Sequence, residues 1–369
     1  MFKKHIFWIF IFSFIFSFIL LGLRGKVFYI PDGDMWSKQA LYFETGDSRQ
    51  FNFDRGYGHP GGPIIEGVIL LHKITKIPYN NPDNLLTLFV TILNSFIIAG
   101  TCVLAYLLKK NKYWWFAILS TLSLSVLYDV ATPPTTIATP LVVFLCLLTL
   151  YYYENKEKIK IPQVSLWAFF AGLLIATRVD IGIFCVLAFL FLLKSVISWR
   201  KISFIIFGAC ISFVIFDPYM WYMPIKHIKD LIFKITFHYA EITTQHMSLW
   251  AILSISIFAF ISIGFLLMIL FSKGKIKSPI PLNFSFMLLV MTVVLYIIFL
   301  TARIQAPRYF QPIISIWEVF LPLFIFPFLP KIFVFYNEEK KQKLVIFFLI
   351  IFQFVALSLL YIFFKKFQN

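Results

Sequence analysis

Long apolar runs that follow one another along the chain constrain its fold more than any other feature. A helix needs about 20 predominantly apolar residues to cross the hydrocarbon core of a bilayer, and helices and closed barrels are the structures that satisfy their backbone hydrogen bonds there. The runs predict an all-α polytopic membrane protein with about eleven transmembrane helices. The expected spans are residues 6–23, 85–108, 114–128, 135–153, 164–177, 181–193, 202–216, 249–271, 283–301, 313–329 and 344–364.

Composition and charge agree with this class. Hydrophobic residues make up 60% of the 369 residues and charged residues 14%, against roughly 25% charged in soluble domains. The net charge of +16 comes from short basic clusters between apolar runs, which is typical of cytoplasmic loops and not of a nucleic-acid surface. The clusters predict a cytoplasmic N-terminus. The four cysteines lack CxxC spacing, which indicates small core residues and neither a disulfide framework nor a zinc site.

Two segments between spans are expected outside the membrane. The first external loop, residues 24–84, holds five of the 17 acidic residues within positions 31–63. Helical spacing of Trp36 and Phe43, and of Ile65 and Val68, predicts two short helices along the outer face. The second external loop, residues 217–248, carries an isoleucine stripe that predicts an interfacial amphipathic helix. One membrane domain, 1–369, is expected, with no soluble C-terminal domain.

Several charged residues are expected at the outer ends of different spans. Such residues either reach the lipid headgroups or serve function, because charge near a membrane is costly. The residues are Asp129, Arg178, Asp180, Asp217, Arg303 and Arg308.

Four motifs in order resemble the GT-C glycosyltransferases, especially enzymes of the protein O-mannosyltransferase and aminoarabinose transferase type. They are Asp32-Gly33-Asp34-Met35-Trp36, Thr45-Gly46-Asp47, His59-Pro60-Gly61-Gly62-Pro63 and Arg308-Tyr309-Phe310-Gln311-Pro312. The chain departs from the family pattern at Gly33, where the family has its second acid. The resemblance implies a GT-C-like fold. It also implies transfer of a sugar from a polyprenyl-phosphate donor to a protein, lipid or glycan acceptor, on the extracytoplasmic side of a bacterial or archaeal plasma membrane.

The residue types fit that chemistry. Transfer to a hydroxyl needs a base, for which Asp32 or Asp34 is the candidate. The donor phosphate needs cations, and guanidinium groups bind phosphate in two-pronged geometry. The candidates for donor binding are Arg178, Arg303, Arg308 and Tyr309. Arg178 has the alternative role of pairing with Asp180 or Asp217.

Further candidates in the loops or facing the substrate are His59, Glu66, Asp129 and Glu318. His59 either steers a phosphate or caps the turn before Pro60. Glu318, about two turns into its span, is either a partner for an arginine or part of the acceptor site. Asp32 and Asp34 could together hold a divalent cation, Mg²⁺ or Mn²⁺, although the sequence offers no complete ligand set.

Other membrane functions stay open. A lipid-linked glycan polymerase or ligase would share the substrate class but concentrates its function in a large late loop. A transporter or flippase places charge near mid-membrane and often shows inverted repeats, which this sequence lacks. A non-catalytic assembly subunit is the third alternative.

Overall fold

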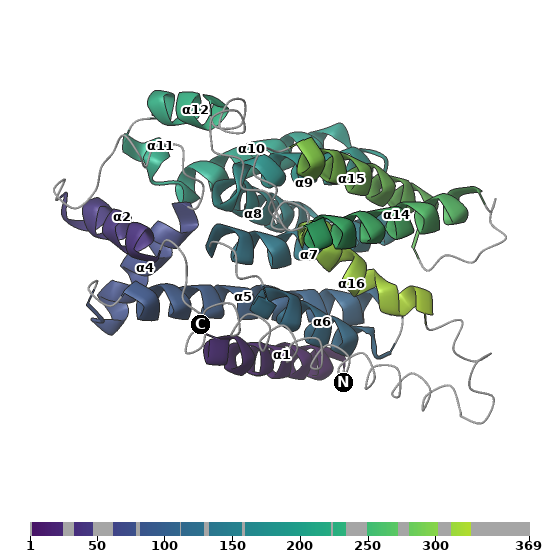
Figure 1. Ribbon diagram of the computed structural model, residues 1–369, viewed down its shortest axis with the longest axis horizontal. Coiled ribbons are helices and arrows are strands. Elements are labelled where there is room, and N and C mark those ends of the chain that lie inside the picture. The colour runs from purple at the N-terminus through teal and green to yellow at the C-terminus, as the bar shows by residue number, and fades with distance from the viewer. Residues whose placement is uncertain are drawn as a thin grey trace.

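The chain forms a bundle of helices in the computed structural model (Figure 1). The structure describes residues 2–24, 33–46, 62–78, 82–110, 112–128, 133–156, 159–222, 224–233, 249–271, 280–301 and 311–325, and within these ranges it has helices and no strand. The helices are α1 Phe2–Arg24, α2 Gly33–Thr45, α4 Gly62–Thr75, α5 Pro82–Leu108, α6 Trp114–Tyr128, α7 Pro133–Glu154, α8 Ile161–Thr177, α9 Val179–Lys194, α10 Trp199–Phe216, α11 Tyr219–Tyr222, α12 Pro224–Phe233, α14 Leu249–Phe271, α15 Leu282–Thr301 and α16 Gln311–Ile325.

Proline marks the start of several of these helices. Because the first turn of a helix has no partners for its N–H groups, proline costs nothing there and its fixed φ favours the helix. The helices that carry proline in the first two positions are α4, α5, α7, α8, α12 and α16.

Four helices in the described ranges are long and apolar enough to cross a membrane. They contain Lys4–Gly22, Leu85–Leu108, Thr136–Glu154 and Trp199–Phe216, and six shorter apolar helices accompany them. The chain is therefore a helical membrane protein. The expected count of about eleven spans stays a prediction, and the last expected span, 344–364, lies outside the described residues.

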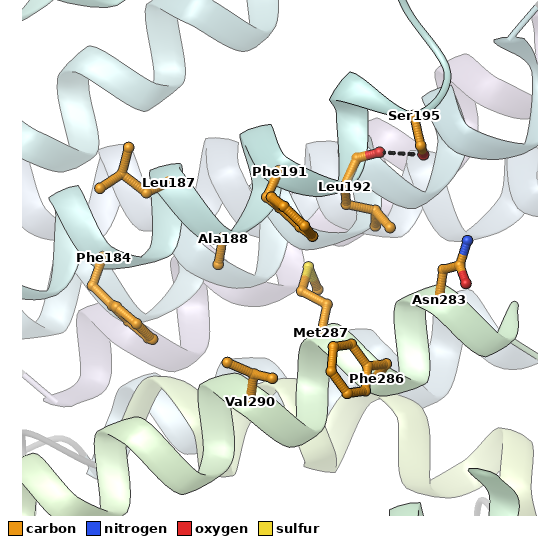
Figure 2. Close-up of a pocket in the computed structure, with 10 residues that line it drawn as sticks. All are labelled: Phe184, Leu187, Ala188, Phe191, Leu192, Ser195, Asn283, Phe286, Met287 and Val290. Carbon is orange, nitrogen blue, oxygen red and sulfur yellow. Dashed lines mark hydrogen bonds between the residues drawn. The ribbon is translucent and has the colours of Figure 1, made fainter.

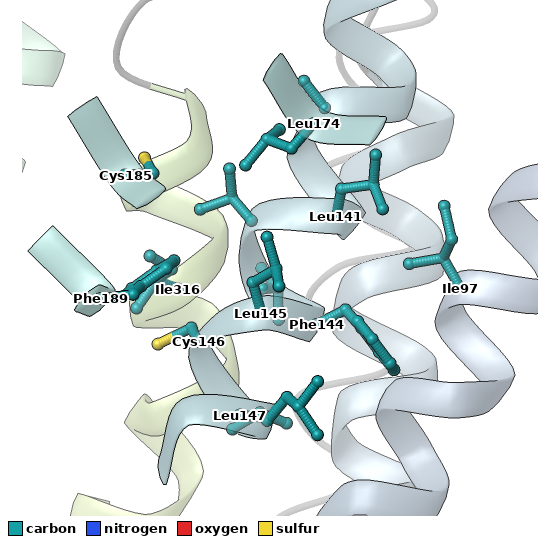
Figure 3. Packing of buried hydrophobic residues seen from close by; sticks show 14 of the residues in the cluster. Ile97, Leu141, Phe144, Leu145, Cys146, Leu147, Leu174, Cys185, Phe189 and Ile316 are labelled. Atoms are coloured by element: carbon teal, nitrogen blue, oxygen red, sulfur yellow. The ribbon is translucent and has the colours of Figure 1, made fainter. Parts of the chain in front are cut away.

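Helix α7 lies at the centre of the bundle. Protein covers 89% of its apolar stretch, against 17% for α1, so α1 faces outward. Figure 3 shows side chains of α7 packed against those of α5, α8, α9 and α16. Cys146 of α7 belongs to this core, as do Cys102 and Cys185, but Cys210 is exposed, which corrects the expectation that all four cysteines are core residues.

Small residues bring α8 and α10 into close contact. A Cβ added at Gly172 would collide with the carbonyl oxygen of Ala209 and lie 2.7 Å from the nitrogen of Phe213. The hydroxyl of Ser212 donates a hydrogen bond of 2.8 Å to the carbonyl of Phe169. Small residues at such interfaces allow helices to approach closely in a membrane, where lipid gives no hydrophobic drive for association.

Helices α8 and α10 run in the same direction. Near their starts, Lys201 Nζ donates a hydrogen bond of 2.8 Å to the carbonyl of Ile159. Further along both helices, Gly172 of α8 lies against Ala209 and Phe213 of α10. The residues that follow the two helices, Arg178 and Asp217, therefore lie at the same end of the bundle.

The opposite end is the basic end, defined here by Lys110, Glu154 and Lys201. Lys110, two residues after the end of α5, pairs with Glu154 of α7 at 2.5 Å. The phenol of Tyr152, in the last turn of α7, donates to the carbonyl of Gln163 in the first turn of α8. These contacts join the last turns of α5 and α7 to the starts of α8 and α10.

Candidate functional site

Helices α2, α4, α11 and α12 gather at the end of the bundle away from the basic end (Figure 1). Both helices expected in the first external loop are present, as α2 and α4. Of their predicted apolar residues, Trp36, Ile65 and Val68 are fully buried and Phe43 is partly buried. Helix α2 packs on α4 and α5. The expected position of these two helices on the outer membrane face stays a prediction.

Gly62 sets how closely α4 approaches the bundle. A Cβ at this position would collide with the carbonyl oxygen of Phe216 and lie 2.8 Å from Cα of Asp217. Any other residue at position 62 would force α4 away from the end of α10. The close approach places Glu66, one turn further along α4, in the electric field of Asp217.

Asp217 connects the end of α10 to α11 and α12. One carboxylate oxygen, Oδ1, accepts the backbone N–H of Tyr219 at 3.2 Å, as a capping aspartate does at a helix start. The other, Oδ2, lies 2.7 Å from Nε2 of His227 in α12. Both side chains are buried. With Glu66 they form what we call the acid–histidine junction.

Aromatic rings hold the junction in place. The ring of Tyr219 stacks on the imidazole of His227, with centroids 5.1 Å apart and planes inclined by 22°. The ring of Phe43, in α2, packs edge to face against the same Tyr219, with centroids 5.1 Å apart. Helix α2, which begins with the acidic motif of the first loop, is thereby packed against the residues that orient His227.

Glu66 has unusual electrostatics for a carboxyl group. Burial, and then the negative charge of Asp217, raise the pKa of Glu66 to about 8, because both disfavour the charged form. Among the described residues, neither its Oε1 nor Nδ1 of His227 has a hydrogen-bond partner, although both atoms are buried. At neutral pH Glu66 mainly keeps its proton.

The junction combines three groups that can exchange protons. A carboxylate bonded to one ring nitrogen fixes the tautomer and orientation of an imidazole, which leaves the other nitrogen to accept or donate. A carboxyl with a raised pKa is a neutral acid near physiological pH, and perturbed groups of this kind cluster at functional sites. The arrangement is therefore suited to moving a proton or to binding a polar group of a ligand.

Arg178 lies at the same end of the bundle, in the turn between α8 and α9. Its backbone is extended and its N–H donates to the carbonyl of Leu174 at 2.8 Å. Gly182 makes the hairpin tight, since an added Cβ would lie 2.9 Å from Cα of Ile175. Arg178 is buried. Its position agrees with the expected end of a span and is compatible with both predicted roles, binding of the donor phosphate and pairing with an aspartate.

Glu318 does not join the acid–histidine junction. It lies half-buried in α16, next to Val319, whose carbonyl accepts a hydrogen bond of 2.7 Å from the indole of Trp114. Trp114 begins α6, directly after the lysines that follow α5. Glu318 is thus held toward the basic end of the bundle.

The remaining predicted site residues lie outside the described part of the chain. This holds for Asp32, His59, Asp129, Arg303, Arg308 and Tyr309, and for the side chain of Asp34, whose backbone lies in the first turn of α2. Their roles stay predictions. No group of three His, Cys, Asp or Glu side chains suited to a metal ion occurs among the described residues, and the predicted Mg²⁺ or Mn²⁺ at Asp32 and Asp34 is untested.

His227 is the site residue that sequence reasoning missed. The predicted amphipathic helix exists as α12, and its isoleucines Ile225, Ile228 and Ile232 are exposed, as expected for a stripe that meets lipid. The buried face instead carries His227 and, four residues later, Leu231. The sequence did carry a signal for this: His227 and Leu231, four residues apart, share one face of the helix, opposite the isoleucines.

The fold and these buried groups define a helical membrane protein with an ionisable cluster at one end of its bundle. Comparison of the chain with protein-family models, with curated proteins and with solved structures gives no match. The GT-C resemblance of the motifs is neither supported nor opposed by these comparisons.

Proposed function

We propose that this protein is a glycosyltransferase that moves a sugar from a polyprenyl-phosphate-linked donor to an acceptor hydroxyl on the extracytoplasmic side of the membrane. The observation that carries the proposal is the acid–histidine junction, where Glu66, Asp217 and His227 lie against the helices of the first loop. Buried ionisable groups in a membrane protein are costly and mark functional sites. Simple anchoring at the headgroups would not require that they be buried.

The side of the membrane follows from charge. The lysines at the basic end favour the cytoplasm, which puts the junction outside. Lipid-linked sugar donors of this class present their phosphates at the membrane surface, where a site at the end of a helix bundle can reach them. Glycoconjugates of the cell envelope, including glycosylated proteins, are the expected products.

The proposed reaction is a single displacement. Asp32 or Asp34 takes the proton of the acceptor hydroxyl, the acceptor oxygen bonds to the anomeric carbon, and the bond from that carbon to the phosphate oxygen breaks. Arg178, Arg303 and Arg308, with Tyr309, stabilise the charge on the departing polyprenyl phosphate. The packing of Phe43 against Tyr219 supports this role for α2, because it fixes the helix that begins beside the two aspartates.

A transporter or flippase is the second candidate, and Glu318 is the observation that favours it. A half-buried carboxyl within a membrane helix is a typical element of an ion or substrate pathway. A polymerase or ligase acting on lipid-linked glycans would share the donor and the site proposed above.

The test is a transfer assay with the purified full-length protein and radiolabelled polyprenyl-phosphate sugars, with membrane extract as the source of acceptors. We expect release of polyprenyl phosphate, reduced about 10²- to 10⁴-fold when the base is removed by Asp32→Asn or Asp34→Asn. Asp230→Asn in α12, which changes a half-buried aspartate outside the first loop, is the matched control and should retain full turnover. Unchanged release in both loop variants would remove the loop from the mechanism, and no release by the parent protein with any donor would refute the transferase.

A further inference from the structure

A groove runs between α9 and α15, remote from the acid–histidine junction. Its volume is about 600 Å³, within the range of ligand sites. Figure 2 shows the apolar side chains of the two helices facing each other across it, with Ser195 and Asn283 together at one end. Its lining is Phe184, Leu187, Ala188, Phe191, Leu192 and Ser195 from α9 and the residue after it, and Asn283, Phe286, Met287 and Val290 from α15.

The groove opens toward the surroundings of the bundle. Leu192 and Met287 form a buried floor, while Phe191 and Phe286 at the rim are exposed. Both helices are apolar along their length, so the groove faces hydrocarbon in a membrane. A water-soluble ligand would gain nothing there, and the occupant must come from the bilayer.

The length of the groove matches an acyl chain of one leaflet. The stretch of α9 from Phe184 to Leu192 rises about 12 Å, which lies within one leaflet of a core about 30 Å thick. The groove, with a volume of about 600 Å³ along this length, has room for the acyl chain of a lipid. A single hydrocarbon chain fits it.

The polar end of the groove has the features of a headgroup site. Ser195 and Asn283 are exposed there, and Lys194 precedes Ser195. Lys194 Nζ lies 4.7 Å from the ring centroid of Trp199, which is exposed at the start of α10. Exposed tryptophans mark the level of the headgroups, and a lysine at that level attracts anionic lipid.

We propose that this groove binds an anionic phospholipid of the leaflet at the Lys194 end, with one acyl chain between α9 and α15 and its phosphate near Lys194. By the charge rule this is the cytoplasmic leaflet. The bound lipid is a different molecule from the sugar donor, and the proposal does not depend on the transferase function. It would fill a gap in the packing of α15 against α9.

Native mass spectrometry of the full-length protein with added phosphatidylglycerol or phosphatidylcholine tests this. We expect one tightly retained phosphatidylglycerol, and a decrease of at least about tenfold in its retention when Ala188→Trp fills the groove. Gly264→Trp on α14 is the matched control, because nothing lies within 4 Å of a Cβ at that position. Lys194→Gln should keep the lipid but reduce the preference for phosphatidylglycerol about fivefold.

A second measurement uses the unaltered protein. Phosphatidylglycerol with a diazirine in its acyl chain should crosslink to peptides that contain Phe184–Leu192 and Phe286–Val290, and not to the exposed face of α14. Equal retention in Ala188→Trp and the parent, crosslinks spread evenly over the bundle, or displacement of phosphatidylglycerol by polyprenyl phosphate at equal concentration would each overturn the proposal.

Discussion

Two pairs of ionisable side chains at opposite ends of the bundle differ in their contact with water. At the basic end, the side chains of Lys110 and Glu154 are 21% and 25% exposed. At the other end, His227 and Asp217 are 0% and 6% exposed. The first pair keeps contact with water and joins two helix ends, whereas the second is buried where the end of α10 meets α11 and α12.

The difference in burial indicates which end of the bundle has a role beyond stabilising the fold. An exposed pair contributes about 0–1 kcal/mol to stability, and its residues can be exchanged freely. Burying a pair costs desolvation that good geometry only partly offsets, so a buried pair is not an efficient way to stabilise a fold. The three following predictions test this contrast.

The largest effect is expected from Asp217→Ala. Removal of one member of a buried pair costs about 3–5 kcal/mol, because His227 and the N–H of Tyr219 both lose their acceptor. Denaturant titration of the purified protein in detergent measures the loss. Asp217→Asn keeps the shape and one acceptor and should lose less. Equal stability in Asp217→Ala and the parent would show that the junction is solvated.

An intermediate effect is expected from the titration of Glu66, measured as the change in the free energy of unfolding with pH. Its carboxyl has a pKa of about 8 in the folded protein and an ordinary value of 4.5, so the folded state binds the proton more tightly. The free energy of unfolding should therefore fall as pH rises from about 4.5 to 8 and level off above that. Solvent screening of this partly exposed group limits the change to the order of 1 kcal/mol.

The control for the pH experiment is Glu66→Gln, which removes the titrating group and should flatten this part of the stability profile. It should also remain as stable at pH 8 as at pH 5.5. A slope that persists unchanged in Glu66→Gln would assign the effect to other groups.

The smallest effect is expected at the basic end. Glu154→Gln breaks the pair with Lys110 but leaves both residues in contact with water, so it should cost less than about 1 kcal/mol. The difference in stability between variant and parent should shrink further in 1 M salt, because the Debye length there is only about 3 Å. A cost as large as that of Asp217→Ala would mean that the two ends do not differ.

Sequence predicted the helices well because their signals are local. Runs of apolar residues and the helical spacing of Trp36 and Phe43 are each read from neighbouring positions in the chain. The isoleucine stripe of α12 was likewise visible. The number of spans did not follow as directly, since several apolar helices are shorter than a full crossing.

The site was less predictable because it depends on packing between distant segments. Asp217 was expected at a span end, but its bond to His227 needs the turn of α11 between them. Glu66 was a candidate site residue only because it lies in the first external loop. Its raised pKa depends on the close packing of α4 on the end of α10 that Gly62 permits. Glu318 was expected to pair with an arginine or to form part of the acceptor site, whereas the contact of Val319 with Trp114 holds it toward the basic end.

The contrast between the two ends requires that they face opposite sides of the membrane, and impermeant thiol labelling of intact cells tests this most directly. In a variant without native cysteines, Lys229→Cys on the exposed face of α12 should react, and Lys109→Cys after α5 should react only when the cells are permeabilised. Labelling of Lys109→Cys but not of Lys229→Cys in intact cells would place the acid–histidine junction in the cytoplasm and contradict the account.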